Sequence, residues 1–250
     1  MIFPRLLMVT AGLAAIWQIL VYLTGVPHYI LPGPLRVVAV FSTHWHSLGY
    51  HAWVTMVEIV LGLILGTGIG AVCALTMMAS RSLKRWLLPV LVMSQAVPVF
   101  ALAPLLILWL GYGMGSKVTM AILIIFFPVT AAFYDGLRRT DPEWLELAQV
   151  MDAPPLAMLY HIRLPAALPA FASGLRVATA VAPIGAIVGE WVGSSAGLGF
   201  YMLHANARMQ TDLMFAALAL VVAMALILYF SVDWGLKKMV YWQKEKKQEF

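Results

Sequence analysis

Charged residues are scarce in this sequence: Asp, Glu, Lys and Arg make up 11% of its 250 residues, whereas 62% are hydrophobic. An ordinary soluble domain has about 25% charged residues. The composition therefore excludes such a domain and is typical of a chain that lies in a bilayer. The formal net charge of +5 comes from basic residues that recur between long apolar runs. This pattern indicates membrane topology rather than nucleic-acid binding.

Groups that carry out chemistry are also missing. The single cysteine, Cys73, lies in an apolar run, which excludes an intramolecular disulfide and a cysteine metal cluster. No glycine-rich phosphate loop ends in Gly-Lys-Ser or Gly-Lys-Thr, and no nucleophile and base are arranged for catalysis. His44, His46 and His51 have no nearby carboxylate or cysteine ligands, so we interpret them as interfacial residues rather than a metal site. We expect no enzyme activity, metal or cofactor in this chain.

Long apolar segments dominate the chain. A helix that crosses about 30 Å of hydrocarbon needs about 20 apolar residues. The first segment has too long an uncharged run for a signal peptide, so we expect it to be retained as a helix. The outer segment 26–50 begins with a turn and predicts a short interfacial helix over 35–41. We predict one all-α membrane domain over 1–250 with six spans, at 6–25, 55–80, 86–111, 118–134, 166–188 and 213–231.

The basic residues between these segments are distributed unequally. Twelve fall on one side of the predicted membrane and three on the other. The positive-inside rule therefore predicts that both termini are cytoplasmic. The twelve are Arg5, Arg81, Lys84, Arg85, Arg138, Arg139, Arg163, Lys237, Lys238, Lys244, Lys246 and Lys247, and the three are Arg36, Lys117 and Arg208.

The cytoplasmic loop 136–165 is long and amphipathic. Asp141-Pro142-Glu143 is a helix-start pattern and predicts a helix over 142–151. The run Asp152-Ala153-Pro154-Pro155 then breaks the chain, because proline disfavours helix in the residue before it. A second short helix is predicted over 155–161. Lipid contact does not require a helix-turn-helix at this place, so the loop indicates docking to another protein.

The same loop resembles the signature of permeases of ABC importers. That signature reads Glu-Ala-Ala, three residues, Gly, nine residues, Ile, one residue, Leu-Pro, and the spacing is met here without a gap. Leu147 replaces an alanine and Asp152 replaces the glycine. Asp can cap the next helix and adopts left-handed backbone more readily than most residues. The matching residues are Glu146, Ala148, Ile162, Leu164 and Pro165.

The resemblance implies a type I ABC importer permease fold with a cytoplasmic coupling helix that docks on a separate ATPase. It implies a bacterial inner-membrane location, two ATP-binding subunits that hold ATP and Mg, and a periplasmic solute-binding protein. Six spans make half of a usual permease core, so a second copy of this chain is expected. The implied coupling residues are Glu146, Ala148, Asp152, Ala153, Pro154, Pro155, Leu156, Ile162, Leu164 and Pro165.

Further resemblance concerns the substrate. The segments 31–34, 98–105, 109–113, 174–176 and 197–199 are similar to the sulfonate, nitrate and taurine branch of these permeases. Within that branch, 182–186, 189–195 and 204–208 are similar to permeases for hydroxymethylpyrimidine, a thiamine precursor. The resemblance thus implies a pyrimidine precursor as substrate, with a sulfonate, taurine or nitrate as the alternative.

Proline and glycine mark two of the predicted spans. Pro98 and Pro104 should kink the third span, which lines the translocation path in this family, although a packing role is equally compatible. Gly62, Gly66 and Gly70 recur every four residues on the second span. They predict a close helix contact, either within one subunit or across a dimer.

A few charged residues lie in or near the spans. Arg176 is expected to bind helix-end carbonyls or to line the path, since Glu58 should lie much farther outward on its own helix. Glu190 and Arg208 bracket the outer stretch 189–211, which we interpret as the outer gate and the dock for the binding protein.

Two other classes of function remain open from the sequence. An ion-coupled secondary transporter would need intramembrane carboxylates or broken helices near the midplane. A membrane enzyme or assembly protein would need titratable residues that converge on one leaflet. Neither class explains the docking signature.

Overall fold

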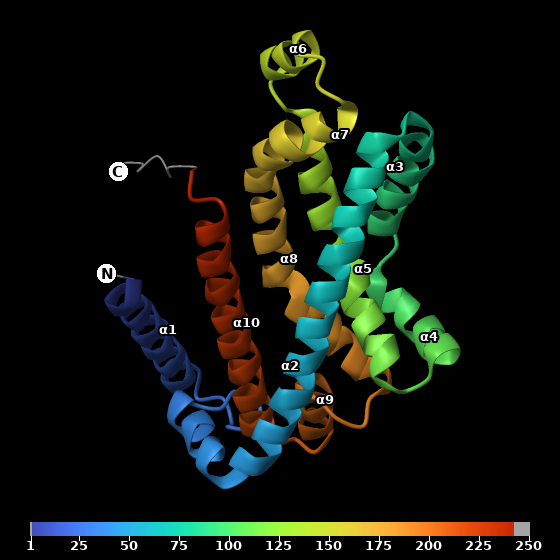
Figure 1. Ribbon diagram of the computed structural model, residues 1–250. Coiled ribbons are helices and arrows are strands. Elements are labelled where there is room, and N and C mark those ends of the chain that lie inside the picture. The colour runs from blue at the N-terminus through green and yellow to red at the C-terminus, as the bar shows by residue number, and fades with distance from the viewer. Residues whose placement is uncertain (1, 243–250) are drawn as a thin grey trace.

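The computed structural model describes residues 2–242, with side chains from Met8 onward, and every regular element in this range is a helix (Figure 1). This confirms the expected all-α fold class. α6 and α7 project from one end of the bundle, and α9 lies at the opposite end. The helices are α1 (Ile2–Thr24), α2 (Pro34–Ala79), α3 (Arg81–Ala96), α4 (Val99–Leu110), α5 (Met114–Arg138), α6 (Pro142–Val150), α7 (Pro155–Met158), the π-helical turn η1 (Leu159–Arg163), α8 (Leu164–Gly193), α9 (Leu198–Ala207) and α10 (Thr211–Met239).

Four helical stretches of the described chain are long and apolar enough to cross a membrane: α2, α5, Pro155–Gly193 and α10. α3 and α4 give a fifth if this bent pair counts as one span, and α1 is a shorter apolar helix over Met8–Thr24. These elements correspond in order to the six predicted segments. The six-span topology itself stays a prediction.

The second predicted span lies within a longer helix. α2 starts at Pro34 and continues to Ala79, so the predicted interfacial helix and the predicted span form one element. His44, with φ −121° and ψ 19°, interrupts the helical backbone and marks a kink between the two parts. The sequence between them contains no proline that would end the helix, which is why the helix continues.

The third predicted span is broken rather than kinked. α3 and α4 meet at an angle of 104° on either side of Val97 and Pro98. Pro98 is the residue before α4, and its extended backbone, with ψ 118°, ends the helical path. Pro104 lies inside α4 and leaves that helix continuous. The kink expected at Pro98 is therefore a full break between two helices, whereas Pro104 produces no break.

The glycines on α2 form a seam within the chain. Gly62, Gly66 and Gly70 are buried against α5. A Cβ atom added at Gly66 would lie 2.8 Å from Ile125 Cγ2, and one at Gly62 would overlap the Cβ of Ala121. The glycines thus let the two helix backbones approach closely. This answers the question that the sequence left open between a subunit-internal seam and a dimer seam.

α8 also packs closely on α5 through glycines. A Cβ atom at Gly185 would lie 2.7 Å from the Ala121 backbone, and one at Gly189 would lie 3.1 Å from that of Lys117. Small residues therefore bring α2, α5 and α8 together into the main core of the described chain.

The seam leads to a stability prediction with a matched control on the same helix. Gly66→Ala should destabilise the protein by about 1–3 kcal/mol, because the added methyl group has to displace Ile125. Gly68→Ala meets no atom within 4 Å and should be neutral or stabilise by up to about 1 kcal/mol through helix propensity. Thermal unfolding of both variants in detergent measures the difference. Equal midpoints for the two would contradict the seam.

Candidate functional site

The first short helix of the cytoplasmic loop forms as predicted. Asp141 is the N-cap of α6, and its side chain accepts a hydrogen bond of 3.0 Å from the Glu143 backbone N–H. Pro142 occupies the first helical position, where its missing N–H costs no helical bond. α6 ends at Val150, one residue before the predicted end.

The turn after α6 depends on Asp152. This residue has a φ of +48°, in the left-handed region. It occupies the position of the glycine in the family signature, so the tolerance expected of Asp at this place is confirmed. Its side chain does not cap the next helix: Pro154 is the N-cap of α7 and makes no side-chain hydrogen bond there.

The second short helix is not a separate element. α7 begins at Pro155 as expected, but it passes through the π turn η1 directly into α8, so that Pro155–Gly193 is one continuous helical stretch. The predicted end at 161 is therefore wrong. Pro165 comes two residues after the π turn and Pro169 lies inside α8, and neither ends the helical stretch.

The loop presents large apolar side chains to the surroundings. Val150 is 83% exposed, Met151 73% and Leu156 67%. Tyr160, on η1, is also exposed. All four residues lie outside the predicted span 166–188, and a cluster of exposed apolar side chains of this kind is typical of a protein interaction site.

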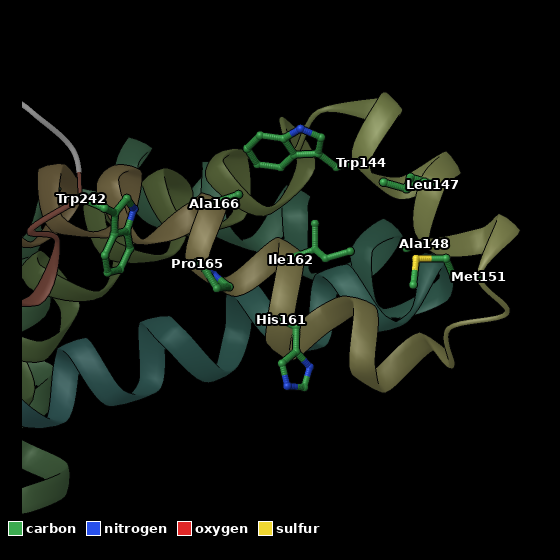
Figure 2. Close-up of a pocket in the computed structure, with 9 residues that line it drawn as sticks. All are labelled: Trp144, Leu147, Ala148, Met151, His161, Ile162, Pro165, Ala166 and Trp242. Atoms are coloured by element: carbon green, nitrogen blue, oxygen red, sulfur yellow. The ribbon is translucent and has the colours of Figure 1, made fainter.

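A groove of about 660 Å³ runs along this end of the molecule, between α6 and the start of α8 (Figure 2). Its lining is mostly apolar. In Figure 2 it extends from Met151 near α6, past Ile162, to Trp242 at the other end. Trp242 follows α10 and was missed by the sequence analysis, because its approach to the loop depends on how α10 packs. The lining residues are Trp144, Leu147, Ala148, Met151, His161, Ile162, Pro165, Ala166 and Trp242.

The signature residues have different exposures. Glu146 is exposed on α6, whereas Ala148 is buried. The Ala148 carbonyl accepts a hydrogen bond of 3.0 Å from the Ala153 N–H, which closes the turn. Ile162 and Pro165 line the groove, so the structure brings the two halves of the signature together. Their role in coupling stays a prediction.

A second site, which is polar, lies at the opposite end of the bundle, where the chain enters α9. Three successive backbone N–H groups at this entry are bound by side chains. Gly197 N–H donates to His51 Nδ1 (3.0 Å), Leu198 N–H to Thr55 Oγ1 (2.8 Å) and Gly199 N–H to Glu190 Oε2 (2.5 Å). The Thr55 hydroxyl in turn donates to Glu190 Oε1 (2.6 Å). His51 is thus part of this network.

Glu58 and Lys117 extend this site toward α5. Lys117 Nζ lies 3.6 Å from Glu58 Oε1, and both side chains are buried, at 7% and 1% exposure. Neither oxygen of Glu58 has a hydrogen-bond partner among the described residues. Lys117 is therefore not an exposed loop charge as the topology count assumed, because α5 begins at Met114 and carries it inside the bundle.

Arg176 has a different partner from those considered in the sequence analysis. Its Nε donates to Asp233 Oδ1 over 2.7 Å, which joins α8 to α10. Asp233 also lies 3.1 Å from Lys237 Nζ. The expected bonds to helix-end carbonyls are replaced by this ion pair. Asp233 was missed because the last span was predicted to end at 231, whereas α10 continues to Met239.

The outer stretch 189–211 contains a helix between two turns. α8 continues through Glu190 to Gly193, and α9 then occupies most of the remainder. Glu190 is buried, whereas Arg208 is exposed at the C-terminal end of α9. The roles of Pro98, Pro104, Arg176 and Glu190 in the path or gate stay predictions.

Curated relatives match this chain over most of its length. A probable ABC transporter permease of Haemophilus influenzae is 57% identical over 94% of this chain and 96% of the relative. The formylaminopyrimidine transport permease ThiX of Halalkalibacterium halodurans is 39% identical over 80% of this chain and 78% of the relative. The riboflavin transport system permease RibX of Chloroflexus aurantiacus is 36% identical over 92% of this chain and 87% of the relative.

Structural and family comparisons agree with these matches. A subunit of the inward-facing MetNI methionine ABC transporter has a TM-score of 0.62 at 17% identity, covering 77% of this chain and 94% of that chain. This likeness shows the type I importer permease fold. The model of the family described as "binding-protein-dependent transport system inner membrane component" matches residues 66–240. The chain therefore belongs to that family, the permeases of ABC importers.

Proposed function

We propose that this chain is the permease subunit of an ATP-driven importer whose substrate is a small solute with a pyrimidine ring. It acts in the bacterial inner membrane as a homodimer with cytoplasmic termini. Two separate ATPase subunits supply the energy, and a periplasmic binding protein delivers the solute. The chain itself hydrolyses no ATP and binds no cofactor; ATP and Mg are held by the ATPase subunits.

The observation that carries the proposal is the exposed helix-turn-helix at one end of the bundle. Its apolar side chains Val150, Met151 and Leu156 are exposed outside the predicted spans, beside the groove in Figure 2. A cluster of exposed apolar side chains of this kind is typical of a surface that a partner covers. The family signature falls on the same elements, which supports an ATPase as that partner.

Similarity to two relatives supports the class of substrate. ThiX and RibX are named for the transport of formylaminopyrimidine and riboflavin, and both molecules contain a pyrimidine ring. A sulfonate is the second candidate, because the putative aliphatic sulfonates permease SsuC of Bacillus subtilis is 33% identical over 85% of this chain.

The test is affinity purification of this chain with the ATPase and binding protein encoded beside it, followed by ATPase assays in proteoliposomes. We expect a complex whose ATPase activity rises when the binding protein is added with hydroxymethylpyrimidine or formylaminopyrimidine. Taurine and an alkane sulfonate serve as matched ligands. Stimulation by taurine or the alkane sulfonate, but not by the pyrimidines, would overturn the proposed substrate class. If the chain purifies without an ATPase, the proposal that it belongs to an ATP-driven importer fails.

A further inference from the structure

We propose that Glu190, held by Thr55 and by the entry of α9, fastens α9 to the outer end of α8, so that α9 follows the ATPase-driven movement of α8. This inference rests on the proposed function. It assigns to Glu190 and Thr55 a positioning role in transport. This role is more than the stabilisation of the fold that their hydrogen bond would provide in any case.

The entry of α9 is attached to α2 and α8 by hydrogen bonds. The N–H groups of residues 197–199 point at side chains of α2 and α8, as they would point at a bound anion at a helix N-terminus. Here the Gly199 N–H donates to the carboxylate of Glu190 in the same chain, and the other two N–H groups donate to His51 and Thr55. Glu190 is 1% exposed and Thr55 is fully buried. Breaking this site would leave several buried polar groups without partners, so it is a strong attachment.

Two glycines at the entry of α9 leave room for the Glu190 carboxylate. Gly197 has a φ of +108°, a conformation that L-residues with a side chain rarely adopt. A Cβ atom at Gly197 would overlap the Glu190 carboxyl group, and one at Gly199 would lie 2.9 Å from Glu190 Oε2. Both glycines therefore allow the backbone to close around Glu190.

Glu190 lies near the outer end of a long helix. It lies three residues before the end of α8, whereas the same continuous helical stretch begins at Pro155 in the docking loop. By helical rise, Pro155 and Glu190 are about 50 Å apart along this stretch. One helix therefore joins the docking surface to the α9 entry, as its path from α7 to the end near α9 shows (Figure 1).

Thr55 connects the three helices that meet at the entry of α9. The α8–α9 connection is four residues long, and the bonds of Gly197, Leu198 and Gly199 fix its geometry. Thr55 accepts from Leu198 and donates to Glu190, so its hydroxyl joins all three helices. Without that hydroxyl, the Glu190 carboxylate would lose the donor that orients it, and the bond from Gly199 N–H would be the one hydrogen bond left between Glu190 and α9 among the described residues.

The test compares Thr55→Val, which keeps the shape but removes the hydroxyl, with Thr55→Ser, which keeps the hydroxyl. Both are made in the full transporter in proteoliposomes. We expect Thr55→Val to lower the number of solute molecules imported per ATP at least tenfold while ATPase activity persists. Thr55→Ser should retain most of the wild-type ratio. A wild-type ratio in Thr55→Val would overturn the proposal.

A measurement on the wild-type complex tests the same inference without a variant. Hydrogen exchange of a peptide that spans 197–199 should stay equally slow in the nucleotide-free and the ATP-trapped transporter, because α9 remains fastened to α8. Faster exchange in the trapped state would overturn the proposal. If the wild-type complex itself imports nothing, the proposed function fails instead, so the two failures are distinguishable.

Discussion

Replacing Leu156 by glutamate is expected to abolish stable association with the ATPase subunit. Leu156 lies on α7 and is 67% exposed, so a charged side chain at this position is tolerated by the permease alone. In the complex the carboxylate would be buried against the partner. A central interface residue contributes about 2–4 kcal/mol, which corresponds to a loss of affinity of about 30- to 700-fold.

The matched control is Leu35→Glu, because Leu35 is 80% exposed near the start of α2, far from the docking loop. Co-purification and ATPase activity are measured for both variants at equal permease levels in the membrane. We expect loss of both in Leu156→Glu and retention of both in Leu35→Glu. Full retention in Leu156→Glu would show that α7 does not lie in the ATPase interface.

Replacing Lys117 by methionine is expected to be the most destabilising single change in the buried polar site. Glu58 has no hydrogen-bond partner among the described residues, and the ammonium group of Lys117 is 3.6 Å away. Glu190, by contrast, has two hydrogen bonds of its own. Removing one member of a buried ion pair costs about 3–5 kcal/mol, because the remaining charge is left uncompensated.

The double variant Glu58→Gln with Lys117→Met is the control for this prediction. It removes the uncompensated carboxylate, so it should recover most of the stability that Lys117→Met loses. Thermal unfolding in detergent and the amount of protein in the membrane report the effect. If Lys117→Met unfolds at the wild-type temperature, or if the double variant is no more stable than Lys117→Met, the ion pair does not stabilise the fold.

The helices could be predicted from the sequence more reliably than their ends. Apolar length located every long helix, because about 20 apolar residues in a row have few alternatives in a bilayer. It placed the start of the second span at 55, whereas α2 starts at Pro34. Polar residues before 55, such as His51, belong to that helix, and His51 binds the Gly197 N–H at the entry of α9. Apolarity alone could not indicate this.

The two ends of the molecule differ in how far the sequence predicted them. The conformation of the docking loop depends on nearby residues in the sequence: Asp141 caps α6, and Asp152 turns the chain, through contacts within a few residues. The outer site is not local. Thr55 and Glu190 are separated by 135 residues and meet only because the glycines on α2 and α8 bring both helices against α5. Glu190 stood out as a charge, but its partners could not be inferred.

The break between α3 and α4 has a consequence for which side of the protein can face lipid. Pro98 has no N–H group, and a bend of 104° leaves nearby carbonyl groups without helical partners. Val97, at the bend, is 42% exposed in the single chain. Hydrocarbon tails supply no hydrogen bonds, so an open backbone at membrane depth needs water or protein beside it. We therefore expect water or protein, and not acyl chains, beside Val97 and Pro98.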